Sequence, residues 1–207
     1  MSSFPAQPQP AAAGPADAQR DPADDTAAVA GTGASGTSLA AGLFRESRPK
    51  QWIKNLLVLT APLASGTIDQ RATLGPVAVA FVAFCLAASA VYFANDLLDV
   101  EADRQHPTKR NRPIAAGIIP IRLAWVCVVV LSAAALGVAL IDNSGTLAVI
   151  AVYLAMHLSY SAWLKHVLVL DLALVAGGFL LRAMVGGVAA NIPLSQWFLL
   201  TTGFASL

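Results

Sequence analysis

The chain has 207 residues, of which 57% are hydrophobic and only 12% are charged. Soluble domains carry about a quarter charged residues, so this composition excludes an ordinary soluble enzyme. Residues 1–40 contain one Arg and four Asp, which leaves 12 basic and 8 acidic residues, a net charge of +4, in residues 41–207. We therefore expect a polar tail followed by a membrane-embedded domain.

The first 40 residues are rich in Ala, Pro, Gly and Ser, with four prolines among the first 15 residues. A secretory signal places a basic region before an apolar stretch, and that order is missing here. The segment carries too little apolar surface to offset the entropy of ordering. We predict a disordered N-terminal tail over residues 1–40 and a transmembrane domain over residues 41–207.

Long uncharged runs mark the expected membrane spans, because a helix needs roughly 20 apolar residues to cross the hydrocarbon layer. These runs cover residues 55–68, 72–95, 123–141 and 143–164; a fifth span covers about 167–188, and a sixth begins near 194. The first run is short, but it extends backwards through Trp52, and we expect Pro62 to bend it. The sequence thus predicts an all-α, polytopic helical bundle.

Leu207 ends the chain inside the sixth apolar segment, so we expect a C-terminally truncated chain that is inactive without the missing helices. The charges between the spans indicate the orientation. Basic residues gather before the first run and between the second and third, whereas Arg71, Asp69 and Asp142 lie at the opposite ends. By the positive-inside rule, the tail and the loops after the second and fourth spans face the cytoplasm.

An acidic cluster follows the second span. At about 100° per residue, Asp99 and Asp103 lie within about 60° of Asp96 on a helix, so the three carboxylates share one face. Mg²⁺ prefers such oxygen ligands and is commonly bound by one or two carboxylates together with substrate phosphates. We interpret the cluster as a magnesium site; the alternative is a solvated helix end neutralised by Arg104 and Lys109.

A basic loop comes next, between Pro107 and Pro113. Its cations Lys109, Arg110 and Arg112 are suited to phosphate groups, since arginine offers a fork of donors and lysine a point charge. The alternative interpretation is a topology signal or attraction to anionic lipids. Beside the acidic cluster, the loop favours a ligand of the metal–diphosphate type.

Four further groups are candidates for substrate binding, each with a structural alternative. Lys50 and Lys54 lie four residues apart on the first helix and therefore share one face, where they bind phosphate or anchor the interface. Tyr160 and Lys165 end the fourth span. Asp171 binds metal or ribose hydroxyls, or stabilises a helix start. Arg182 must face the bundle interior, where it binds phosphate or, as we slightly favour, has a structural role.

Several motifs together resemble the UbiA superfamily of intramembrane prenyltransferases. They are Asn95-Asp96-x-x-Asp99-x-x-x-Asp103, the stretches 48–55, 99–104 and 106–117, Tyr160 to His166 with Asp171, and 181–187. The fuller match, over about residues 44–190, is to the branch that transfers phosphoribose to a polyprenyl phosphate. This resemblance implies a bundle of nine helices, of which about five and a half are present here.

The resemblance also implies a reaction and its participants. Ribose 5-phosphate passes from 5-phosphoribosyl diphosphate to a polyprenyl (decaprenyl) phosphate in cell-wall arabinan synthesis, and diphosphate is released. Mg²⁺ is the cofactor, Asp96, Asp99 and Asp103 its catalytic ligands, and Asn95 a substrate-binding residue. We expect an inner (plasma) membrane protein with a cytoplasmic site, no nucleic-acid partner, and a possible homo-oligomer.

Many superfamily members carry a second Asp-x-x-x-Asp motif, but here Val175 stands four residues after Asp171. A symmetric two-metal site is therefore not expected, as in the phosphoribosyl branch. One alternative is a prenyltransferase that attaches a polyprenyl chain to an aromatic acceptor, which normally needs the second acid pair. The other is a non-catalytic transporter or subunit, although transporter charges gather nearer the bilayer midplane.

Overall fold

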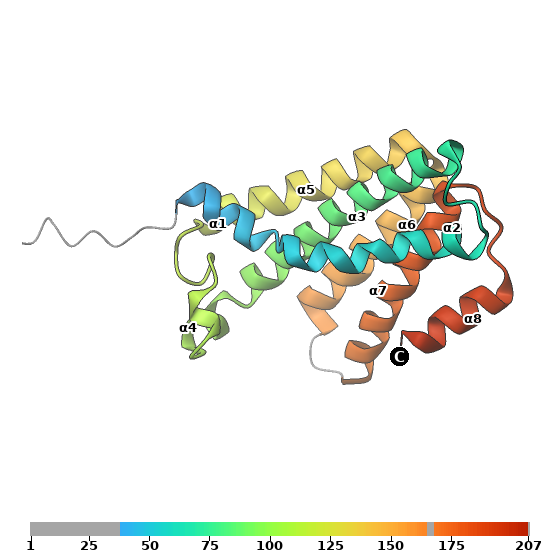
Figure 1. Ribbon diagram of the computed structural model, residues 1–207. Coiled ribbons are helices and arrows are strands. Elements are labelled where there is room, and N and C mark those ends of the chain that lie inside the picture. The colour runs from blue at the N-terminus through green and yellow to red at the C-terminus, as the bar shows by residue number, and fades with distance from the viewer. Residues whose placement is uncertain (1–37, 165–167, 207) are drawn as a thin grey trace, which may run out of the picture. The chain divides into compact units, whose positions relative to one another are not determined.

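The computed structural model describes residues 38–164 and 168–206, and every regular element in this part of the chain is helical (Figure 1). The long helices are α3 (Arg71–Leu98), α5 (Ile121–Asp142), α6 (Ser144–Ser159) and α7 (Leu168–Ala189). The short segments are α1 (Leu39–Glu46), η1 (Pro49–Leu59), α2 (Thr60–Ala64), α4 (Val100–Gln105), η2 (Lys109–Asn111), η3 (Tyr160–Leu164) and α8 (Gln196–Ala205). The all-α prediction is confirmed for these residues.

Four helices in the described part of the chain are long and apolar enough to cross a membrane. They cover Arg71–Leu98, Ile121–Asp142, Ser144–Ala162 and Leu170–Ala189. These helices correspond to the second, third, fourth and fifth predicted spans. The sixth predicted span is represented by α8, which has only 10 residues.

The first predicted span differs from its prediction in both position and geometry. The helical segment runs from Pro49 to Ala64 instead of over residues 55–68, and its first 11 residues form the 3₁₀ helix η1. A 3₁₀ helix rises about 2.0 Å per residue, compared with about 1.5 Å in an α-helix. Sixteen residues therefore cover about 30 Å, which explains how so short a run matches the neighbouring spans.

Residues 1–37 of the predicted tail lie outside the described residues. Helix α1 begins at Leu39, next to the predicted boundary at residue 40. The Ser38 side chain accepts a hydrogen bond from the Ala41 backbone N–H at 3.3 Å and so caps this helix.

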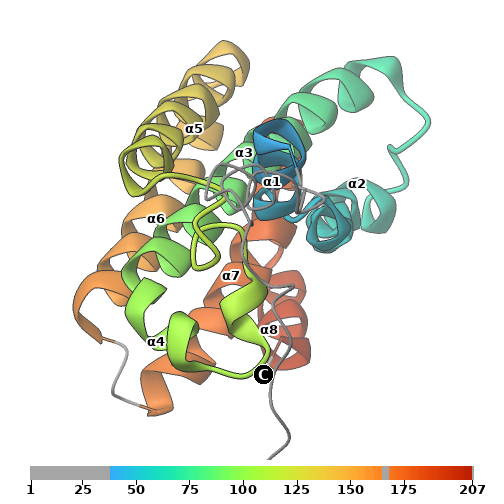
Figure 2. The same ribbon diagram turned by 90° about the vertical axis from the view of Figure 1, so that its left-hand side faces the viewer.

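Helix α3 is the central element and packs against α5, α6, α7 and η1. Figure 2 shows α5 and α6 on one side of α3 and α2 on the other. The contact between α3 and α5 uses alanines, which share one buried cluster: Ala80, Ala83, Ala87, Ala90, Ala135 and Ala139. Because small side chains let helix backbones approach closely, this Ala-rich sequence favours tight packing of α3 within the bundle.

Helix α7 approaches η1 closely at Gly186. A Cβ atom at this position would lie 1.7 Å from the backbone oxygen of Val58. Only glycine fits here, so the sequence Gly186-Gly187 serves helix packing.

The loop after α4 docks onto the same bundle. Ile114 and Ile119 are fully buried and pack with Phe93 and Leu97 near the end of α3. Burial of two isoleucines contributes about 1.5–3 kcal/mol each, which holds the basic loop beside the acidic helix end.

Candidate active site

The acidic cluster lies where α3 gives way to α4. Asp96, in the last turn of α3, is 3% exposed, and Asp103, in α4, is 2% exposed. Asp99 is the junction residue, with φ −96° and ψ 5°, and it interrupts the two helices. Backbone hydrogen bonds from the Asp99 N–H to Asn95 and from the Asp103 N–H to Asp99 continue across this junction, so the three acids follow one another along two consecutive helices.

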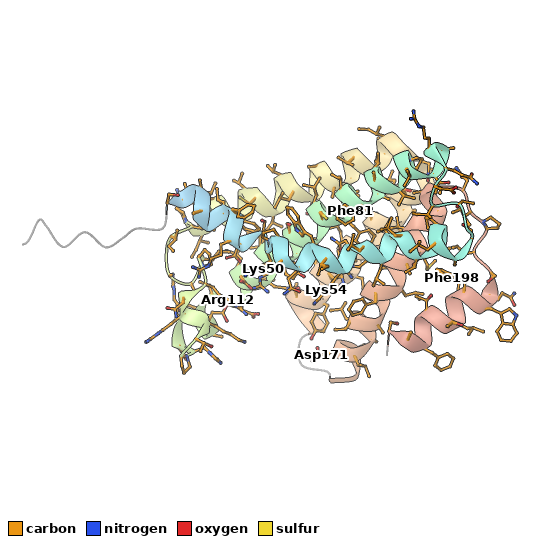
Figure 3. The ribbon with its side chains drawn as sticks, in the orientation of Figure 1. Lys50, Lys54, Phe81, Arg112, Asp171 and Phe198 are labelled. Atoms are coloured by element: carbon orange, nitrogen blue, oxygen red, sulfur yellow. The ribbon has the colours of Figure 1, made fainter. Side chains whose placement is uncertain are left out.

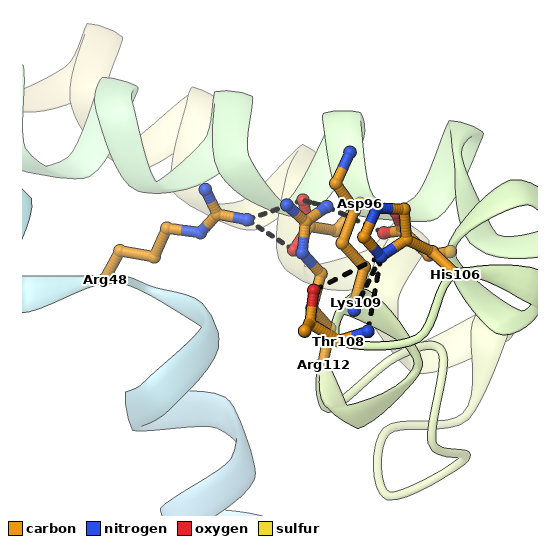
Figure 4. A network of polar contacts seen from close by, with 7 residues as sticks. Arg48, Asp96, His106, Thr108, Lys109 and Arg112 are labelled. Atoms are coloured by element: carbon orange, nitrogen blue, oxygen red, sulfur yellow. Dashed lines mark hydrogen bonds and ion pairs between the residues drawn. The ribbon is translucent and has the colours of Figure 1, made fainter.

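Arg48 binds Asp96 from the other side of the cluster (Figure 4). Its Nη2 atom lies 2.6 Å from both Oδ1 and Oδ2 of the Asp96 carboxylate. The guanidinium also lies 4.8 Å from the centroid of the Tyr92 ring. Charge-assisted bonds of this kind are among the stronger hydrogen bonds in proteins, so Arg48 is a principal partner of the buried acid.

Arg112 joins two of the predicted metal ligands. Its Nη1 atom donates to Asp96 Oδ1 at 3.0 Å and to Asp103 Oδ2 at 2.7 Å. The basic loop and the acidic cluster, which the sequence places next to each other, are thus in direct contact. The structure thus brings Arg112 together with two of the predicted metal ligands.

Glu46 adds a fourth carboxyl group that the sequence reasoning missed. It ends α1, is 1% exposed, and both of its carboxyl oxygens lack a hydrogen-bond partner among the described groups. Burial, the largest cause, and the neighbouring Asp96 together raise the pKa of Glu46 to about 8, while Arg48 and Arg112 oppose this shift. The raised pKa favours the protonated form of Glu46 beside the Asp96 carboxylate.

The turn between α1 and η1 positions Arg48. Ser89 Oγ, buried in α3, lies 3.0 Å from the Ser47 backbone oxygen and accepts from Trp52 Nε1 at 3.1 Å. Arg48 itself adopts a left-handed backbone conformation with φ 50°, which is uncommon for a residue other than glycine. Such conformations cost on the order of 1 kcal/mol and often occur at functional sites.

The loop after α4 presents its remaining cations to solvent. His106 Nδ1 accepts from the backbone N–H groups of Thr108 at 3.3 Å and of Lys109 at 3.4 Å, which shapes the start of η2 (Figure 4). The Lys109 and Arg110 side chains are exposed, and no other described side chain binds them. They are accessible to an anionic ligand.

Lys50 and Lys54 do not share a face as predicted. Because η1 is a 3₁₀ helix, residues four apart are separated by about 120° instead of the 40° of an α-helix. Both lysines are exposed, without a side-chain partner in the described chain (Figure 3). Lys50 lines a cavity of about 380 Å³ at the α1–η1 junction, whereas Lys54 does not.

Asn95 contacts the end of α6. Its Oδ1 atom accepts from Ser161, which also donates toward the His157 backbone oxygen at 2.8 Å. Ser161 and Tyr160 belong to η3, a π-helical turn, where the sequence predicted an uninterrupted helix. Such turns occur frequently at functional sites. Tyr160 is half-buried, and no described side chain binds it.

Asp171 lies in the first turn of α7 (Figure 3). Its Oδ1 atom is buried and has no hydrogen-bond partner among the described groups. A buried carboxylate oxygen of this kind suits a ligand donor or a metal ion. Lys165, the other candidate near this helix, lies outside the described residues.

Arg182 occupies the bundle interior, as predicted, and is 7% exposed. It donates to Asn55 Oδ1 at 2.8 Å, to the Gly178 backbone oxygen at 2.7 Å and to Tyr153 Oη at 3.0 Å. Among the described residues, no carboxylate forms an ion pair with it. These neutral partners come from η1, α6 and α7, which favours the structural role.

The donor set fits a hard divalent cation in its chemistry, because Asp96, Asp103 and Glu46 all offer carboxyl oxygens. Both Glu46 oxygens have no hydrogen-bond partner among the described groups, and Asp96 and Asp103 share Arg112. However, no group of three His, Cys, Asp or Glu side chains in the described ranges is arranged to hold a metal ion. Arg48 and Arg112 supply the positive charge there instead.

Known proteins are similar to most of the chain. The family model of the UbiA prenyltransferase family matches residues 56–207. Over 174 residues, the chain is 53% identical to the decaprenyl-phosphate phosphoribosyltransferases of Corynebacterium glutamicum and Mycolicibacterium smegmatis. These matches cover 82% of this chain but only 52% and 55% of the two relatives, so the chain spans about half of their length.

A solved structure supports the fold. The UbiA homolog from Archaeoglobus fulgidus bound to DMAPP and Mg²⁺ superposes with a TM-score of 0.68, at 19% sequence identity, over 79% of this chain and 59% of that one. The apolar helices and these similarities identify a multi-pass membrane protein. The chain belongs to the UbiA prenyltransferase family.

Proposed function

We propose that this protein transfers 5-phosphoribose from 5-phosphoribosyl diphosphate to a polyprenyl phosphate, with decaprenyl phosphate as the acceptor. The similarity to two phosphoribosyltransferases over 82% of the chain supports this proposal. The observation that carries it is the contact of Arg48 and Arg112 with Asp96 and Asp103 at one end of α3. This site offers carboxylates to a metal ion and guanidinium groups to phosphates.

Asp96, Asp99 and Asp103 would hold Mg²⁺, which when bound neutralises negative charge on the diphosphate. The guanidinium groups of Arg48 and Arg112 bind carboxylate oxygens with the same fork geometry that suits phosphate. They are therefore able to exchange a carboxylate for a donor phosphate. Lys109 and Arg110, exposed beside them, attract the anionic donor.

In the transfer, the bond between the anomeric carbon and the diphosphate oxygen breaks, and the electron pair leaves with diphosphate. An oxygen of the acceptor phosphate then forms the new bond to that carbon. The acceptor oxygen is already an anion, so no general base is needed. Positive groups fixed around the leaving diphosphate stabilise the developing charge, which is usually the largest catalytic effect.

The membrane bundle suits this acceptor, because the isoprenoid chain stays in hydrocarbon while the phosphate reaches the site. We place the protein in the inner (plasma) membrane with this site at the cytoplasmic face. The cations around the α3–α4 end support that orientation.

The proposal is tested with the protein expressed from its own gene in membrane vesicles. Labelled 5-phosphoribosyl diphosphate, decaprenyl phosphate and Mg²⁺ should yield labelled lipid. Asp96→Asn should lower turnover by about 100-fold or more, because it removes a carboxylate from the site. Glu101→Gln, an exposed acid in the same region, is the matched control. Product formed only from a polyprenyl diphosphate and an aromatic acid would instead identify a prenyltransferase.

A further inference from the structure

A cavity of about 380 Å³ lies at the junction of α1 and η1. It is lined by Phe44, Arg45, Arg48, Pro49, Lys50 and Gln51. Three of the six lining side chains are cations. A concave site with several positive groups and apolar walls suits an anionic ligand that also carries a hydrocarbon part.

The three cations differ in what already binds them. Arg45 donates to the Asn111 backbone oxygen, and Arg48 binds Asp96 at 2.6 Å. Lys50 has no side-chain partner in the described part of the chain. The cavity therefore has two cations that already bind groups of the protein and one whose ammonium group is available to a ligand.

The apolar surface around the cavity points to a lipid. Phe44, in its wall, is 65% exposed, and Ile53, one 3₁₀ turn beyond Lys50, is 69% exposed. A soluble sugar phosphate gains nothing from such residues, whereas a hydrocarbon chain covers them. Arg48 also connects the cavity to the acidic cluster, so a phosphate bound here lies next to the groups that carry the proposed reaction.

We infer that this cavity binds the phosphate headgroup of the polyprenyl phosphate acceptor, with its hydrocarbon chain leaving past Phe44. The choice of ligand rests on the proposed function. Lys50 contributes a charge-assisted contact to the headgroup, and Arg48, which pairs with Asp96, lines the same cavity.

The test measures binding and kinetics separately. Binding of decaprenyl phosphate is measured by native mass spectrometry, without donor, in nanodiscs of uncharged phosphatidylcholine. Lys50→Gln should weaken binding about tenfold, because it removes one hydrogen-bonding charge. Arg122→Gln, an exposed cation at the start of α5, controls for the general loss of positive charge and should leave binding within about twofold of the parent.

Kinetics then distinguish the acceptor from the donor. Lys50→Gln should raise the KM for decaprenyl phosphate about tenfold and leave the KM for 5-phosphoribosyl diphosphate within about twofold. Phe44→Ala should weaken the binding of decaprenyl phosphate more than the binding of a short-chain prenyl phosphate. A rise in the donor KM alone, or unchanged binding in Lys50→Gln, would overturn the inference.

Two further outcomes are informative. Equal displacement of decaprenyl phosphate by phosphatidylglycerol would assign the cavity to general anionic lipids and overturn the inference. Lys50-dependent binding of decaprenyl phosphate without any transfer in the parent protein would support the site but contradict the proposed function.

Discussion

Two arginine environments in this protein differ in exposure and in the charge of their partners. At the end of α3, Arg48 and Arg112 bind carboxylates, and their side chains are 31% and 29% exposed. In the bundle interior, Arg182 is 7% exposed and binds an amide, a hydroxyl and a backbone carbonyl. Arg48 and Arg112 can exchange their carboxylate partners for a ligand from solvent. Arg182, in contrast, is held by groups from three helical elements.

A charged side chain inside a membrane bundle therefore does not by itself indicate a binding site. Intramembrane arginines are functional hypotheses by default. Here three hydrogen bonds and the rings of Phe84, Tyr153 and Phe179, each within 6 Å of the Arg182 guanidinium, satisfy that group within the protein. The arginines at the α3 end face acids instead, which a cation can also bind.

The largest expected effect is that of Arg112→Gln. The variant should lose turnover by about 100-fold, because it removes a group that we propose binds the donor phosphates. It should also unfold at a lower temperature, because Asp103 is left buried without this partner. Added Mg²⁺ should reverse part of this decrease in the midpoint temperature of unfolding, which is measured by tryptophan fluorescence in detergent. No rescue by Mg²⁺ would contradict the view that the metal and Arg112 bind the same acids.

Arg182→Met should lower stability without rescue by Mg²⁺. The substitution leaves Asn55 Oδ1 and Tyr153 Oη without this donor, at about 1–3 kcal/mol for each buried group. The measurement is the same thermal unfolding experiment with and without Mg²⁺. If the variant unfolds at the parent's temperature but loses affinity for 5-phosphoribosyl diphosphate, Arg182 belongs to the substrate site.

Glu46→Gln should change how stability depends on pH. Because the pKa of Glu46 is raised from 4.5 to about 8 in the folded protein, the folded state holds a proton that the unfolded state releases. Stability of the parent should therefore fall between about pH 4.5 and pH 8, by on the order of 1 kcal/mol per pH unit. The Gln variant has no ionisable group at this position and should lose this slope. Parallel pH profiles for the two proteins in Mg²⁺-free buffer would contradict a protonated Glu46.

Glu101→Gln should have the smallest effect. Glu101 pairs with Arg104 at 2.8 Å, but the two side chains are 76% and 43% exposed. Exposed pairs contribute about 0–1 kcal/mol, so the thermal midpoint should hardly move. A large loss of stability here would mean that exposure does not separate the exchangeable from the fixed charges in this protein.

The membrane helices follow from local features of the sequence, which explains why most of them were predicted. A run of about 20 apolar residues has one stable solution in lipid, a helix that satisfies its own backbone. The geometry of η1 was not predictable in this way. Its 3₁₀ form depends on how it packs against α3 and α7, including the close approach of Val58 to Gly186.

The sequence by itself determined the all-helical membrane fold, the acids at the end of the second span and the basic loop that follows them. It determined these because apolar runs and neighbouring charges are local properties of the chain. The positions of Glu46 and Arg48 beside the acidic cluster became known only from the tertiary structure. These residues come from α1 and its junction with η1, about 50 residues before Asp96. The tertiary structure also shows that Lys50 and Lys54 lie on different faces of η1, and it identifies the partners of Arg182. Both depend on helix geometry and packing, which residue spacing alone does not predict.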